Sequence, residues 1–295
     1  MTYPAQSGDS HAFSLAQAYW NHRHTLAEMK DRILLFSRAA NDPISLSLYQ
    51  FAQLAAASLE FRPDLILELG RGAGNSTCVF TEVANRLGLG SGRVVSFDIY
   101  QNWELHTVPR LKPYVSEDWF VPLSALTQNL LAFDFHAALA DAKRILVFWD
   151  AHGFDVAECV LGAILPELAH RPHLVMMHDM CDLRYGAPGN LDYGNHGIWK
   201  KTDFDGPRLK LGFIDSAVEQ SISIFDFATR NRLPLHSADH DLHSAFASDN
   251  ARLSELKELI GELHSLSGNW FYFSLNEIPG PYTFPRFSYA GANQE

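Results

Sequence analysis

The sequence has few of the features that mark secreted, membrane or nucleic-acid-binding proteins. Its three cysteines (Cys78, Cys159 and Cys181) are odd in number and lack the spacing of a metal site, so we expect reduced thiols in a cytoplasmic protein. No stretch approaches the length of a membrane span, and residues 1–13 lack a basic segment followed by an apolar run. The net charge of −11 and the lack of a Lys/Arg run argue against a nucleic acid or an anionic membrane as partner.

The sequence shows no internal repeat and no low-complexity segment. A hydrophobic content of 47% is enough for one sizeable domain with appendages. We expect an N-terminal helical extension over residues 1–62 and a larger domain over residues 63–295. Apolar residues at helical spacing predict helices over residues 10–40 and 45–59. These helices cover the mouth of a site, form the surface of a homo-oligomer, or only bury core area.

The chain is organised around a strand, a glycine turn and a helix over residues 63–87. Residues 64–69 form an apolar run that is too short for a helix and ends at a glycine. Gly70, Gly72 and Gly74 follow at alternate positions, and a hydroxyl at Ser76 or Thr77 is expected to cap the next helix. Such a turn gathers backbone N–H groups and the positive end of a helix dipole, which suits a nucleotide-like or carboxylate-bearing ligand.

The spacing of these glycines discriminates between ligands. A dinucleotide fingerprint needs a third glycine at position 75, where this chain has Asn75, which counts against a nicotinamide-dependent oxidoreductase. An acid, Glu68, stands instead two residues before the first glycine. A second predicted strand, residues 93–99, contains Asp98 near its end. An acid at that position can accept hydrogen bonds from both ribose hydroxyls of a nucleoside, or it can cap the following loop.

Further apolar runs alternate with helical patterns. Strands are predicted over residues 119–123, 144–149, 172–177, 233–236 and 269–275, and helices after the fourth strand and over residues 212–230 and 250–266. This alternation predicts a Rossmann-like, doubly wound α/β fold with a mostly parallel seven-stranded sheet. Asp150 and His152 follow the fourth strand, and His178 and Asp179 follow the fifth. Because the carboxyl ends of parallel strands meet at one edge, we expect these four side chains to share a mouth with Glu68 and Asp98.

The acid followed by three alternating glycines resembles the first motif of class I S-adenosylmethionine-dependent methyltransferases. The resemblance sharpens toward the macrocin O-methyltransferase and cephalosporin-hydroxylase-type group of small-molecule tailoring proteins. It depends on Asp42-Pro43, Asn75-Ser76, the Asp-x-His at 150–152 and the His-Asp at 178–179. It covers roughly residues 40–185 and, more faintly, residues 212–230.

The resemblance implies that residues 63–295 bind S-adenosylmethionine. The glycine turn would lie against the amino-acid and ribose parts of the cofactor. The implied cofactor-binding residues are Glu68, Gly70, Gly72, Gly74, Asn75, Ser76 and Asp98, with Ser124 near the adenine. The group's strand-end acids hold Mg²⁺, which by position makes Asp150, His178 and Asp179 candidate metal ligands and His152 the candidate general base.

Two positions depart from the group's pattern. The group has an acid where His178 stands, and imidazole favours Mn²⁺, Fe²⁺ or Zn²⁺ over Mg²⁺. It also has an acid where His152 stands, and histidine is a good base near neutral pH. A metal-free site with His152 as base therefore competes with a metal site.

The expected function is methyl transfer to a hydroxyl of a small natural product. Two alternatives remain: a partner or scaffold subunit that binds the cofactor without turnover, and the oxidoreductase. A Gly- and aromatic-rich segment over residues 180–210 has the composition of a lid or substrate loop. The cluster His236, Asp239, His240, Asp241 and His243 favours a solvated polar loop over a metal site.

Overall fold

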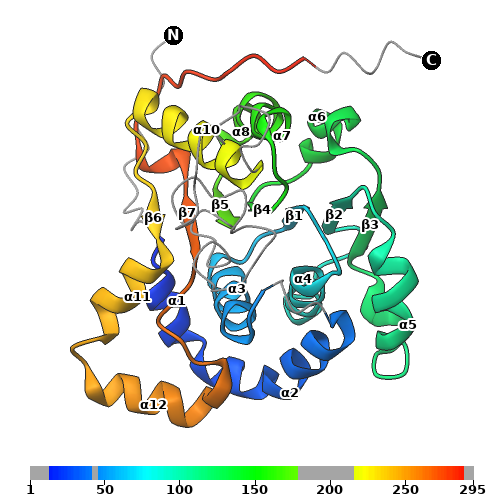
Figure 1. Cartoon of the computed structure of the whole chain (residues 1–295), viewed down its shortest axis with the longest axis vertical. Helices are drawn as coiled ribbons and strands as arrows, with labels where there is room; N and C mark the ends of the chain where they lie inside the picture. The colour runs from blue at the N-terminus through cyan, green and yellow to red at the C-terminus, as the bar shows by residue number, and fades with distance from the viewer. Residues whose placement is uncertain (1–12, 42–45, 179–215, 289–295) are drawn as a thin grey trace, which may run out of the picture.

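A computed structural model of the chain describes residues 13–41, 46–178 and 216–288 (Figure 1). Its centre is a seven-stranded sheet of order β3-β2-β1-β4-β5-β7-β6. The strands are β1 (Leu65–Leu69), β2 (Val94–Asp98), β3 (Leu123–Thr127), β4 (Ile145–Trp149), β5 (His173–His178), β6 (His236–Ser237) and β7 (Trp270–Phe273). Strands β1 to β5 pair in parallel, while β7 is antiparallel to both β5 and β6. The predicted Rossmann-like fold with a mostly parallel seven-stranded sheet is confirmed.

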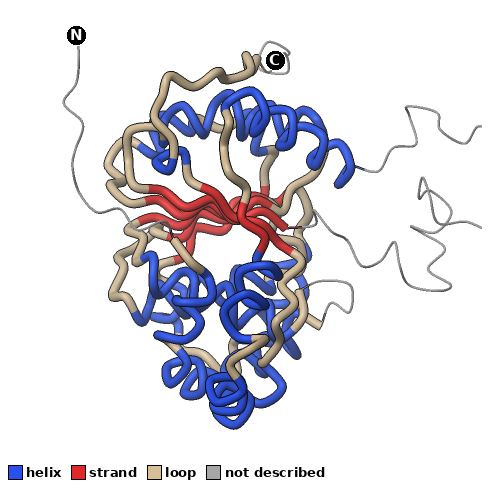
Figure 2. Tube along the Cα trace, turned by 90° about the vertical axis from the view of Figure 1, so that its left-hand side faces the viewer, coloured by secondary structure: helices blue, strands red, loops and turns tan. Residues whose placement is uncertain are grey.

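Helices cover both faces of the sheet, which Figure 2 shows between two helical layers. One layer contains α1 (Leu15–Asn21), α2 (Arg23–Ala40), α3 (Leu48–Phe61), α4 (Asn75–Arg86), α11 (Ala238–Phe246) and α12 (Asn250–Ile260). The other contains α6 (Phe135–Leu139), α7 (Phe154–Cys159), α8 (Leu165–Leu168) and α10 (Ser216–Asn231). A π-helical turn (Trp103–Thr107) and α5 (Val108–Leu111) follow β2.

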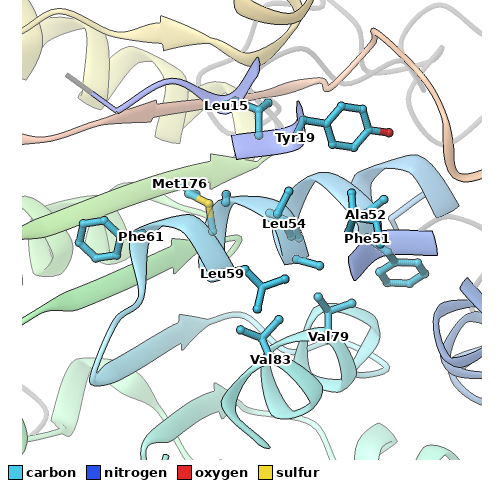
Figure 3. Packing of buried hydrophobic residues seen from close by; sticks show 14 of the residues in the cluster. Leu15, Tyr19, Phe51, Ala52, Leu54, Leu59, Phe61, Val79, Val83 and Met176 are labelled. Atoms are coloured by element: carbon cyan, nitrogen blue, oxygen red, sulfur yellow. The ribbon is translucent and has the colours of Figure 1, made fainter. Parts of the chain in front are cut away.

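The N-terminal helices share one hydrophobic core with the sheet. Leu54 and Leu59 of α3 pack near Val79 and Val83 of α4 and Met176 of β5 (Figure 3). Strands β1, β4 and β5 are buried on both faces, which explains why their sequences are mostly apolar without a regular alternation of polar residues. Whether helices α1 to α3 also form an oligomer surface stays a prediction.

Three local predictions from the sequence are wrong. Residues 117–120 form a 3-10 turn, and the third strand begins only at Leu123, after Pro122. The polar cluster at residues 236–243 is not a loop, because Ser237 caps helix α11, whose Leu242 and Phe246 are buried in the core. Strand β6 is correspondingly short and begins at His236 instead of Leu233.

Two of the three cysteines lie in the described part of the chain. Cys78 and Cys159 are buried and unbridged, and burial raises the pKa of the Cys159 thiol to about 12. Cys181 lies outside the described residues. Within the described ranges, no helix has both the length and the apolar character that crossing a bilayer requires.

His173, at the start of β5, makes the stability sensitive to acid. Its Nδ1 bonds Arg171 O at 2.8 Å, and its Nε2 accepts from Leu275 N–H at 2.9 Å, so the ring is neutral. Burial lowers its pKa. The unfolded chain therefore takes up this proton first, and the stability present above about pH 6.5 is lost as the pH falls toward the folded-state pKa.

We expect His173→Gln to flatten this acid dependence, because the amide keeps an acceptor without a titrating group. Thermal melts at pH 7.5 and 5.5 measure the difference, with His170→Gln, an exposed neighbour, as the control. Equal pH dependence in all three proteins would contradict the assignment.

Candidate functional site

The glycine turn lies between the carboxyl end of β1 and the start of α4. A Cβ on Gly70 would lie 2.7 Å from the backbone of Asp150, and one on Gly74 would lie 2.1 Å from the Trp103 ring. Gly72, at φ +55°, has no atom of the described residues within 4 Å of that position. Gly70 and Gly74 therefore permit close packing inside the protein, while Gly72 is the glycine that faces open space.

The first turn of α4 differs from the prediction. Gly74 is the N-cap residue, so neither Ser76 nor Thr77 caps the helix. Their hydroxyls donate instead to the carboxylate of Glu68, at 2.5 and 2.7 Å. Glu68 is fully buried, and burial raises its pKa against the opposing effect of these hydrogen bonds. Glu68 and Ser76 thus tie β1 to α4, and their direct contact with a ligand stays a prediction.

Asp98, the last residue of β2, lies beside the open glycine. Its Oδ2 accepts from Gly72 N–H at 2.6 Å, and its Oδ1 accepts from Tyr100 N–H at 2.7 Å. Each carboxylate oxygen retains a further lone pair for a ligand hydroxyl. The next two side chains, Ile99 and Tyr100, are 61% and 63% exposed although both are apolar or aromatic. The end of β2 therefore offers an acid and an apolar surface together.

Asn75, the first residue of α4, carries a buried acceptor without a partner. Its Oδ1 makes no hydrogen bond to any described residue, although the side chain is almost fully buried. A buried polar atom is normally satisfied, so this oxygen indicates a donor that the described residues do not supply.

Ser124 does not lie where the sequence placed it. It is the second residue of β3 and pairs with Val95, the second residue of β2. The carboxyl end of β3 is Thr127, beside Asp98 in register. Ser124 therefore lies near the start of β3, because the strand begins four residues later than predicted, and its place near the adenine stays a prediction.

The strand-end residues Asp150 and His178 do meet. His178 Nδ1 lies 3.1 Å from Asp150 Oδ1, and His178 Nε2 lies 3.0 Å from Gln50 Nε2. The Gln50 carbonyl accepts from Ser47 N–H in a capping box, which turns its amide nitrogen toward His178. Nε2 of His178 is therefore the acceptor, and its Nδ1–H donates to Asp150.

Gln220 of α10 connects His152 to His178 by hydrogen bonds. Gln220 is buried, and its Nε2 donates to His178 O at 3.4 Å. Its Oε1 accepts from Nδ1 of His152 at 2.6 Å. The neutral His152 ring then carries its lone pair on Nε2, the form in which imidazole accepts a proton.

The described residues of the predicted metal site do not fit a metal ion. Both ring nitrogens of His178 are committed to Gln50 and Asp150, so neither offers a lone pair to a cation. Among the described residues, no three His, Cys, Asp or Glu side chains gather as a metal site would need, and this includes the cluster at residues 236–243. Asp179 and the lid-like segment at 180–210 lie outside the described residues.

We expect the two glycines to respond differently to alanine. Gly74→Ala should lower the free energy of unfolding by about 1–3 kcal/mol, because the new methyl group overlaps the Trp103 ring. Gly72→Ala meets no atom and should cost about 1–2 kcal/mol of backbone strain alone. Urea unfolding followed by fluorescence compares them, and a larger loss for Gly72→Ala would contradict this packing.

Gln50 and Gln220, which orient the rings of His178 and His152, were not predicted from the sequence. Gln50 had a signal, since Ser47-x-x-Gln50 is a capping-box pattern before an apolar run. No sequence pattern indicated Gln220, because a glutamine on an amphipathic helix is usually exposed and nothing in the sequence marks this one as buried.

No family model matches the chain, and no curated protein matches it. The solved structures that resemble it include two methyltransferases. A methyltransferase from Podospora anserina bound to S-adenosylhomocysteine has 12% identity and a TM-score of 0.42, over 77% of this chain and 84% of that one. The O-methyltransferase TomG from Streptomyces achromogenes, involved in tomaymycin synthesis and in complex with S-adenosylmethionine, has 16% identity and a TM-score of 0.41, over 70% and 81%.

These identities and scores are too low to transfer an activity. The strand order, the antiparallel β7 and the glycine turn between β1 and α4 are features of the chain itself. They give it a Rossmann-like, doubly wound α/β fold.

Proposed function

We propose that the chain is an S-adenosylmethionine-dependent methyltransferase that acts on a hydroxyl of a small molecule. The observation that carries the proposal is the pairing of Asp98 with the N–H of Gly72, the glycine that faces open space. An acid fixed at the end of β2 beside a glycine turn suits the two hydroxyls of a ribose.

The amino-acid end of the cofactor would lie toward α4. The unpartnered Oδ1 of Asn75 can accept from its ammonium group, and the positive end of the α4 dipole favours its carboxylate. The exposed Ile99 and Tyr100 offer an apolar surface to the base. Glu68 and Ser76 support this arrangement by holding β1 against α4.

His152 is the proposed general base. Gln220 holds its proton on Nδ1, so Nε2 takes the proton of the acceptor hydroxyl as that oxygen attacks the methyl carbon. When bound, S-adenosylmethionine would supply the methyl group: the carbon–oxygen bond would form as the carbon–sulfur bond breaks, with the electron pair of that bond staying on sulfur. The protein's contribution is position and proton transfer, without a covalent intermediate. No step needs a metal ion, in keeping with the committed nitrogens of His178.

Calorimetry with S-adenosylhomocysteine and with NADH tests the proposal against the oxidoreductase. We expect saturable binding of S-adenosylhomocysteine and none of NADH. The reverse pattern would overturn the proposal. Binding without methyl transfer to any member of a panel of hydroxylated acceptors would instead favour a scaffold subunit.

A further inference from the structure

The segment that follows β2 contacts the glycine turn at successive positions. The ring of Trp103 packs on Gly74 so closely that no side chain would fit there. The hydroxyl of Thr107 donates to Ala73 O at 2.6 Å. Trp103, Glu104 and Thr107 lie on one turn of helix, and we call these three residues the turn clamp.

Glu104 supplies the third contact, to Arg71. The Arg71 side chain has no exposed surface, and its Nη1 donates to Ser96 O at 2.9 Å. Its Nη2 donates to Glu104 Oε1 at 3.2 Å and to Thr127 Oγ1 at 3.1 Å, while Thr127 also donates to Glu104. Glu104 is the one acid within ion-pair distance of Arg71 in the described part of the chain. A buried guanidinium needs such a partner, so this pair fixes where Arg71 lies.

The turn clamp therefore fixes the residues on both sides of Gly72. Arg71 and Ala73 flank it, and its N–H is the group that meets Asp98. The clamp also follows Asp98 by only a few residues, so it connects both partners of this hydrogen bond. A shift of the clamp would move Gly72 and Asp98 relative to each other.

From this geometry we infer that Glu104 is a positioning residue for cofactor binding, which it serves through Arg71 and without taking part in methyl transfer. The inference rests on the proposed function. Loss of Glu104 should weaken the binding of the cofactor, while turnover at saturating cofactor should persist.

The test compares Glu104→Gln with Glu117→Gln. The control breaks an exposed ion pair with Lys112 in the same connection, 3.8 Å long and remote from the turn. For Glu104→Gln we expect the Kd of S-adenosylhomocysteine to rise about tenfold, as for loss of a charged hydrogen bond, and the control to bind like the wild type. At saturating S-adenosylmethionine, kcat should stay within about twofold and the acceptor KM should not move.

Hydrogen exchange at the amides of Gly72 and Gly74 gives a readout that needs no cofactor. Both amides are bonded in the native turn, and we expect faster exchange in Glu104→Gln than in the control. Thr107→Val, which removes the bond to Ala73 without altering charge, provides a second variant if Glu104→Gln does not fold. Unchanged Kd and exchange, or faster exchange across the whole sheet, would overturn the inference. If the wild type does not bind S-adenosylhomocysteine, the proposed function fails, and the exchange data still decide whether the clamp holds the turn.

Discussion

Replacing His152 by alanine is expected to lower kcat by 10²–10⁴, on the order that loss of a general base costs. The reason is the tautomer that Gln220 imposes, which puts the lone pair of the ring on Nε2, the nitrogen proposed to take the acceptor's proton. Cofactor affinity should be nearly unchanged, because Asp98 and Gly72 are bonded to each other and not to His152. Single-turnover kinetics with saturating S-adenosylmethionine, beside calorimetry, separates the two effects.

His170→Ala is a suitable control, since His170 is an exposed histidine at the end of the same strand-to-strand connection. A His152 variant with full activity would rule out the base. A variant that loses stability and activity in proportion would show that the imidazole only packs against α10.

Asp98→Ala should weaken the binding of S-adenosylhomocysteine by about 1.5–3 kcal/mol, roughly 10- to 150-fold. The substitution removes the acceptor for the ribose hydroxyls and also releases the N–H groups of Gly72 and Tyr100. Asp98→Asn keeps one acceptor oxygen and should lose less affinity. Calorimetry on both variants and on Asp118→Ala, which removes an exposed acid of the same region, measures the effect. Equal affinity in all three would place the cofactor elsewhere.

The core of this fold could be predicted because parallel strands that are buried on both faces have mostly apolar sequences. Residues 65–69, 145–149 and 173–178 are mostly apolar runs followed by glycine or polar residues, and all three are strands. The third strand was misplaced because it is an edge strand with only partly buried positions, preceded by the aromatic pair Trp119-Phe120 in a 3-10 turn. That error moved Ser124 to the wrong end of the sheet.

The candidate site was predicted at residues in or close after the carboxyl ends of strands. Glu68, Asp98, Asp150, His152 and His178 could be placed from the topology alone. Their partners could not, because Gln50, Gln220 and Glu104 come from separate helices and act by hydrogen bonds. The predicted metal site is an example. His178 has the position of a metal ligand in the sequence, but its two ring nitrogens are hydrogen-bonded to Gln50 and Asp150.

A crystal structure with S-adenosylhomocysteine tests the central claim most directly. The account predicts the ribose hydroxyls within hydrogen-bond distance of Asp98 and the amino-acid portion beside Gly72 and Asn75. A nucleoside bound away from Asp98, or a glycine turn left empty at saturating S-adenosylhomocysteine, would contradict it.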